Sequence, residues 1–141
     1  MREYFEREEW MDCSFILAEE LDRAGDPWAA CRLLFDIIEE ENKNPWFRHF
    51  FPDVLQYLKE IVRLRLVPQT DPELVLDILE EMVRLPMPQK ERARYWRMLG
   101  DAYDAIDEEE QAQRAWSQAL NCDGNLKLAR NKMQRLQREV L

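Results

Sequence analysis

The stretch that decides the fold runs from Ala93 to Gly124 and reads ARYWRMLGDAYDAIDEEEQAQRAWSQALNCDG. Its apolar residues recur at helical spacing on both sides of Asp107, which is typical of two amphipathic helices joined by a short turn. The small residues Gly100 and Ala112 let the two helices approach closely. Large side chains then fill the space around that contact, namely Trp96, Leu99, Tyr103 and Trp116. The stretch therefore predicts a tightly packed helical hairpin.

Two earlier helices begin with a shared signal. Asp26 and Asp71 are each followed by a proline, so each position pairs an N-cap carboxylate with a residue suited to the first helical position. Apolar residues at helical spacing lie on both sides of each pair. We therefore expect hairpins over about 5–42 and 52–85, before the third hairpin over about 90–121.

Beyond Gly124, an apolar stripe at helical spacing predicts a last helix over about 125–140. Residues 121–141 carry five bases and two acids, whereas the preceding residues carry a net charge of −12. This contrast suits a capping helix with a polar outer face, because bases near a helix C-terminus are favoured by the helix dipole. Salt-sensitive binding to an acidic surface is the alternative interpretation.

The composition favours helices throughout the chain. Only 3 of the 141 residues are Gly, and Leu, Glu, Ala, Arg, Gln and Met are abundant. Hydrophobic residues make up 46% of the chain and charged residues 35%, which is enough to bury a core and keep a polar surface. At this length we expect one all-α domain over residues 1–141.

The net charge of −9 would repel a phosphate backbone unless bases were segregated on one face. We therefore expect no nucleic-acid partner. No stretch approaches the roughly 18 apolar residues of a membrane span, and acids occupy the place where a signal peptide needs an apolar run. These observations predict no membrane partner and a cytoplasmic location.

The cysteines and the histidine offer no metal-binding pattern. Cys13, Cys31 and Cys122 are widely spaced and form no CxxC pair, and His49 is the single histidine. We interpret the cysteines as buried or unused thiols in a reducing compartment. The sequence predicts neither a metal nor another cofactor.

Catalysis has little support in the sequence. Adjacent acids such as Glu39 and Glu40 point about 100° apart on a helix and usually form a solvated face. His49 has no Ser, Cys or acid at a motif spacing, and the isolated glycines form no phosphate-binding loop. We predict that the chain is not an enzyme.

The third hairpin resembles a known repeat. It is similar to the signature of the tetratricopeptide repeat family over the residues Trp96-x2-Leu99-Gly100-x2-Tyr103 and Ala112-x3-Trp116. Trp116 stands where phenylalanine is usual in the family, Asp107 where the turn glycine is usual, and Gly124 where the closing proline is usual. The resemblance covers about a quarter of the chain, and the two earlier hairpins are degenerate relatives of the pattern.

The resemblance implies an all-α, tetratricopeptide-like solenoid, in which antiparallel helix hairpins stack with a right-handed twist. It also implies that the first helices line a concave groove and that the last helix caps the end. Because family members bind peptides or protein segments in that groove, we expect an adaptor or a chaperone-like scaffold. Two other functions stay open: a structural module that forms homo-oligomers, and a non-catalytic accessory subunit of a larger complex.

The groove would be lined by first-helix residues that face away from the partner helix. These positions hold six acids and two bases, and they are Asp12, Phe15, Glu19, Asp22, Tyr57, Glu60, Leu64, Arg94, Arg97, Asp101 and Asp104. Such a surface suits a mixed or basic peptide. It lacks the Lys and Asn residues by which some family members clamp a C-terminal carboxylate. Alternatively, the charges only keep the solenoid soluble.

A second candidate surface comes from irregular spacing. Asp26 and Asp71 are 45 residues apart, whereas the family period is about 34. The extra length falls at residues 41–51, which contain the aromatic residues Trp46, Phe47, Phe50 and Phe51. Clustered aromatics anchor interfaces, so these four residues are candidates for partner binding. In the alternative interpretation they fold back and cover the seam between the first two hairpins.

Overall fold

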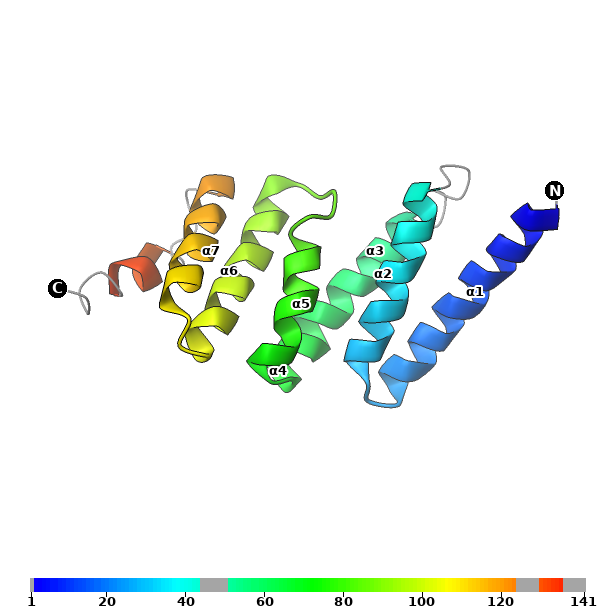
Figure 1. Ribbon diagram of the computed structural model, residues 1–141, viewed down its shortest axis with the longest axis horizontal. Helices are drawn as coiled ribbons and strands as arrows, with labels where there is room; N and C mark the ends of the chain where they lie inside the picture. The colour runs from blue at the N-terminus through cyan, green and yellow to red at the C-terminus, as the bar shows by residue number, and fades with distance from the viewer. Residues whose placement is uncertain (1, 44–50, 124–129, 136–141) are drawn as a thin grey trace. The chain divides into compact units, whose positions relative to one another are not determined.

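The computed structural model describes residues 2–43, 51–123 and 130–135, and its regular structure is helical (Figure 1). No strand occurs in these three ranges, which confirms the predicted all-α class. The chain divides into two compact units, Met1–Thr70 and Asp71–Leu141. The boundary falls inside the predicted hairpin over 52–85, so the helices of that hairpin belong to different units. Each unit is described by itself.

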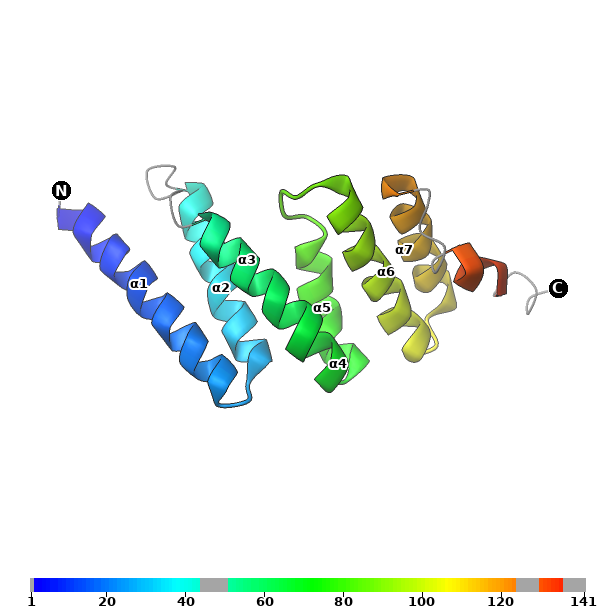
Figure 2. The same ribbon diagram turned by 180° about the vertical axis from the view of Figure 1, so that it is seen from behind.

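The first unit is built on α2, which packs against both α1 and α3. Figure 2 shows α3 crossing in front of α2, with α1 beside them. The elements of this unit are α1 (Arg2–Arg23), α2 (Pro27–Lys43), α3 (Phe51–Ile61), the π-helical turn η2 (Val62–Leu66) and α4 (Val67–Gln69). Buried apolar residues of α2, such as Leu34 and Ile38, form the centre of the core together with Leu58 of α3.

The turn between α1 and α2 follows the capping prediction. Gly25 has a φ of +88°, a left-handed conformation that ends α1 at low steric cost. The Asp26 carboxylate accepts a hydrogen bond from the backbone N–H of Ala29 at 3.1 Å. Asp26 is therefore a side-chain N-cap for α2, as predicted.

The second unit is built on α6, which packs against α5 on one side and α7 on the other. Its elements are α5 (Pro72–Met82), α6 (Gln89–Ala105) and α7 (Glu109–Cys122), and residues 130–135 form a further helical stretch. The buried residues of α5 are Val75, Ile78, Leu79 and Met82, which recur at the spacing of one helical face.

The capping prediction for α5 is wrong in one respect. Asp71 occupies the N-cap position, but its side chain makes no capping hydrogen bond. Its backbone carbonyl instead accepts the Leu74 N–H at 3.0 Å. The start of α5 therefore rests on Pro72, whose fixed φ suits the first helical position and whose missing N–H needs no partner there.

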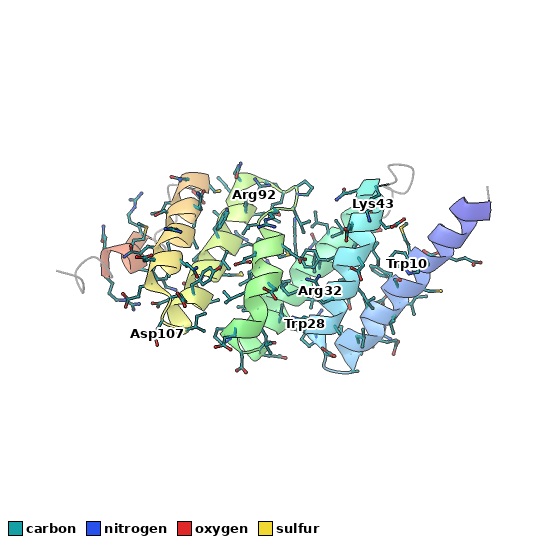
Figure 3. The ribbon with its side chains drawn as sticks, in the orientation of Figure 1. Trp10, Trp28, Arg32, Lys43, Arg92 and Asp107 are labelled. Carbon is teal, nitrogen blue, oxygen red and sulfur yellow. The ribbon has the colours of Figure 1, made fainter. Side chains whose placement is uncertain are left out.

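Asp107 makes the turn between α6 and α7, where it is labelled in Figure 3. Its φ is +62°, and no other non-glycine residue in the described ranges has a positive φ. Asp tolerates this left-handed conformation better than most residues do, because its short polar side chain can bond locally. Asp107, which stands where the repeat signature has its turn glycine, thus adopts a backbone conformation that favours glycine.

Helices α6 and α7 approach each other closely at Gly100 and Trp116. Trp116 is fully buried, and it forms a cluster with Ala112 and Ala119 of the same helix. Trp96 and Tyr103 of α6 pack against this cluster. The small and large side chains whose alternation predicted the hairpin are therefore the ones that pack together in its core.

The helical stretch over 130–135 packs against the same core through Met133. The Ser117 hydroxyl of α7 donates a hydrogen bond to the Met133 sulfur at 3.7 Å. Met133 belongs to the apolar stripe of the predicted last helix. Within the described ranges, no helix combines the length and the low charge that crossing a bilayer requires.

Candidate functional site

Asp22 connects the two outer helices of the first unit. Its carboxylate accepts a hydrogen bond from the Tyr57 hydroxyl at 2.9 Å and another from Arg65 Nε at 2.6 Å. Burial, together with the hydrogen bond to Asp22, raises the pKa of Tyr57 to about 12. Burial opposes the charged form of Arg65, yet the pair with Asp22 outweighs it and leaves the guanidinium pKa raised. The cluster therefore holds a protonated phenol and a charged ion pair at neutral pH.

Arg65 lies in the π-helical turn η2, where the α-helical hydrogen-bond pattern after α3 is interrupted. Pro68 has no backbone N–H, so the α-helical hydrogen bond to the carbonyl of Leu64 cannot form. The chain instead widens into the π-helical turn Val62–Leu66, in which the Val67 N–H bonds to the Val62 carbonyl. A π turn changes the direction of the side chains that follow it along the helix. Here the turn carries Arg65, whose Nε bonds Asp22 of α1.

An apolar cavity lies close to this cluster. We call it the α1–α3 cavity; it has a volume of about 370 Å³, and its lining includes Met11, Phe15, Ile16, Ile37 and Val54. The Phe15 ring lies 5.6 Å from the Tyr57 ring, centroid to centroid, at an interplanar angle of 46°. Phe15 therefore links the cavity to the Asp22 cluster.

Two carboxylates stand at the α1–α3 cavity. Asp12 of α1 and Asp53 of α3 are both exposed and line it. In the described part of the chain, neither residue has an ion-pair or hydrogen-bond partner through its side chain. Ile16, which is 60% exposed, contributes apolar surface beside them. The α1–α3 cavity is therefore apolar and open, with two carboxylates beside it whose negative charge no described residue neutralises.

The structure brings together Phe15, Asp22 and Tyr57 among the predicted groove residues of the first unit. Glu19 and Glu60 lie beside bases, with oxygen to nitrogen distances of 3.8 Å to Arg23 and 4.0 Å to Arg65. Leu64 is 51% exposed. The prediction missed Arg65; its signal in the sequence was Pro68, which stands inside an otherwise helical run.

In the second unit, the predicted acids are engaged by the chain itself. Asp101 accepts hydrogen bonds from Arg97 at 2.8 Å, from the Trp116 indole N–H at 3.1 Å and from Lys132. Asp104 lies 3.5 Å from Arg135. Sequence reasoning assigned these acids to a partner and did not foresee that the last helix supplies bases to them.

The remaining predicted residues are Arg94, Phe51 and the other aromatics of residues 46–51. Arg94 is exposed on α6. Phe51 is the first residue of α3. Trp46, Phe47 and Phe50 of the aromatic insertion lie outside the described residues, as does His49.

Two buried groups bear on reactivity. Cys31 is fully buried, and burial raises the pKa of its thiol to about 12, so the nucleophilic thiolate is disfavoured at neutral pH.

Glu41 is also fully buried, and in the described ranges neither of its carboxylate oxygens has a hydrogen-bond partner. Burial raises the pKa of Glu41 to about 7. No group of three or more potential metal ligands occurs among the described residues.

Comparisons of the chain with protein-family models, with curated proteins and with solved structures found no match.

Proposed function

We propose that this chain is a protein-binding module, and that its first unit takes a partner polypeptide segment in the α1–α3 cavity. The cavity is the observation that carries the proposal. Its volume of about 370 Å³ lies in the range of known binding pockets. Its apolar lining offers burial to a side chain of the partner, and each buried CH2 group contributes about 0.8 kcal/mol.

The charges beside the cavity favour a basic partner segment. Asp12 and Asp53 are exposed and have no intramolecular partner in the described ranges. The first unit as a whole holds 15 acids and 9 bases, a net charge of −6. Lys or Arg residues flanking an apolar anchor would therefore be attracted at long range and neutralised on binding.

We also propose that the helix pairs are of the tetratricopeptide kind and that the protein works in a reducing compartment. The close approach of α6 and α7 at Gly100 and Trp116 supports helix pairs of the tetratricopeptide kind. Cys13, Cys31 and Cys122 are free thiols, which suits a reducing compartment such as the cytoplasm. The module acts by binding and uses no cofactor, and its role is that of an adaptor or a chaperone-like scaffold.

The test uses labelled peptides that carry one central Leu, flanked by four Lys in one version and four Glu in the other. Fluorescence anisotropy should show that the Lys peptide binds to the full chain. Ile16→Ser should weaken that binding about tenfold, which corresponds to about 1.4 kcal/mol of lost apolar contact. Leu17→Ser is the matched control, because Leu17 is 50% exposed and does not line the cavity.

A charge test completes the experiment. Asp12→Lys combined with Asp53→Lys should weaken binding of the Lys peptide but not of the Glu peptide, whereas Asp36→Lys, at an exposed acid of α2 away from the cavity, should have little effect on either. The proposal fails if the Lys peptide does not bind, or if the Ile16 and Leu17 variants weaken its binding equally.

A further inference from the structure

The second unit contains a larger cavity that the proposed function does not use. We call it the α5–α7 cavity; it has a volume of about 550 Å³, is open to solvent, and is lined by residues from the end of α5, from α6 and from α7. Val83, Leu99 and Ala115 give it a buried apolar floor. The half-buried Trp96 and Tyr103 of α6 add aromatic surface. The cavity can therefore accept an apolar or aromatic group.

Two arginines stand at this cavity, on different helices. Arg84 follows the end of α5 and Arg114 belongs to α7, and both are exposed. In the described part of the chain, neither guanidinium forms an ion pair or a hydrogen bond. An arginine without an intramolecular partner keeps its planar set of donors available for a carboxylate.

The carboxylate that lines the cavity is already engaged. Glu80 stands four residues before Arg84, a spacing at which Glu and Arg commonly pair on helices. Its carboxylate instead accepts the hydroxyl hydrogen of Tyr103. Burial and this hydrogen bond raise the pKa of Tyr103 to about 12, so the hydroxyl stays a donor at neutral pH. The described lining thus has two cations against one anion, in a chain whose net charge is −9.

Polar side chains on α7 indicate the kind of ligand. Gln111 and Gln118 line the cavity on either side of Arg114, and their positions place them about two helical turns apart on one face. Each amide can donate to a carbonyl and accept from an N–H, which are the groups that an extended peptide backbone presents. Two such amides along an open cavity suit a polypeptide better than a small anion.

We infer that the α5–α7 cavity is a second binding site, specific for an acidic polypeptide segment that carries an apolar or aromatic side chain. The guanidinium groups of Arg84 and Arg114 bind the acidic side chains, the floor and Trp96 take the apolar one, and the glutamine amides bond the backbone. The site lies in the other unit from the α1–α3 cavity and prefers the opposite charge, so it is independent of the proposed function.

The probe is a labelled peptide with a central Phe flanked by four Asp, compared with the same peptide carrying four Lys. In the chain that carries Asp12→Lys and Asp53→Lys, whose α1–α3 cavity no longer attracts bases, the Asp peptide should bind at least tenfold more tightly than the Lys peptide, and more weakly as salt concentration rises. Arg84→Glu combined with Arg114→Glu should remove this binding. Arg84→Gln combined with Arg114→Gln should weaken it without introducing repulsion.

Arg94→Glu is the matched control for charge, because Arg94 is exposed on α6 and does not line the cavity. Circular dichroism checks that each variant is folded. Ile16→Ser should leave binding of the Asp peptide unchanged, which separates this site from the α1–α3 cavity. Equal binding of the two peptides to the chain with Asp12→Lys and Asp53→Lys, or an equal loss in the Arg94 variant, would overturn the inference.

Discussion

Gly100 of α6 lies directly against the indole of Trp116 of α7. A Cβ atom added at residue 100 would lie 2.3 Å from both Cδ1 and Nε1 of the ring. Real Cβ atoms do not approach other atoms so closely, so the fully buried Trp116 would have to shift within a packed core. The absence of a side chain at residue 100 is therefore what allows the two helices to pack at this distance.

Gly100→Ala should destabilise the protein. Alanine favours a helix over glycine by about 1 kcal/mol, but overpacking of a core costs about 1–3 kcal/mol, and the short contact places this case at the upper end. We expect a net loss of about 1–2 kcal/mol in the free energy of unfolding, measured by urea denaturation. In a Trp116→Leu background the same change should cost less or become stabilising, because the indole is gone. An equal cost in both backgrounds would contradict this explanation.

The Asp22–Arg65 ion pair should stabilise the first unit. The Asp22 side chain is 9% exposed and that of Arg65 is 32% exposed, so solvent screens the pair only in part. A double-mutant cycle with Asp22→Asn and Arg65→Met should give a coupling energy of about 1–2 kcal/mol. Arg63→Met provides the control, because Arg63 is exposed on the same π-helical turn. A coupling to Arg65 no larger than that to Arg63 would show that the pair contributes little.

Glu41 should make the protein less stable as the pH rises. Its pKa is about 7 in the folded chain, compared with an ordinary value of 4.5. Between these two pH values the unfolded chain loses the proton first, so unfolding becomes more favourable with rising pH and levels off above about pH 7. Glu41→Gln removes this effect, and above pH 7 it should raise the free energy of unfolding by as much as about 3 kcal/mol relative to the unmodified chain.

The measurement for Glu41 is the difference in unfolding free energy between variant and unmodified chain at pH 4, 6 and 8. The difference should be small at pH 4 and largest at pH 8. Glu39→Gln, at an exposed residue that pairs with Lys43 at 3.8 Å, should give a nearly constant difference. A flat profile for Glu41→Gln would mean that the carboxylate ionises normally.

Lys132 should hold the helical stretch over 130–135 on the second unit. It bonds to Asp101 and lies 5.9 Å from the centre of the Trp116 ring, so its cation contacts both an acid and an aromatic face. Lys132→Met should speed hydrogen exchange of the amides in this stretch by about fivefold, which corresponds to about 1 kcal/mol. Arg135→Met should have a smaller effect, since Arg135 is 58% exposed and 3.5 Å from Asp104. Equal effects would argue against a specific role for Lys132.

The hairpin around Gly100 was predictable because its determinants are local. Helix periodicity, a turn residue and the alternation of small and large side chains all act within about 32 residues. The N-cap at Asp26 followed from the same short-range rules. At Asp71 the local rule was incomplete, because proline alone can start a helix and leave the aspartate side chain unused.

The partners of the charged residues were not predictable in the same way. Asp22 and Arg65 are 43 residues apart, and Asp101 and Lys132 are 31 residues apart. A helical pattern shows which residues share a face, but it does not show which base of another helix will reach a given acid. The acids at 22, 101 and 104 therefore looked available to a partner, although the folded chain uses them itself.

By itself, the sequence determined that the chain is helical, where its main helices start and end, and that α6 and α7 pack through Gly100 and Trp116. These features depend on backbone propensity and on side-chain size at short range. Only the tertiary structure decided the two cavities, the ion pairs of Asp22 and Asp101, and the burial of Glu41. Each of these depends on how side chains from two or three helices meet, and the energy of such contacts is set by distance and burial, which no single helix specifies.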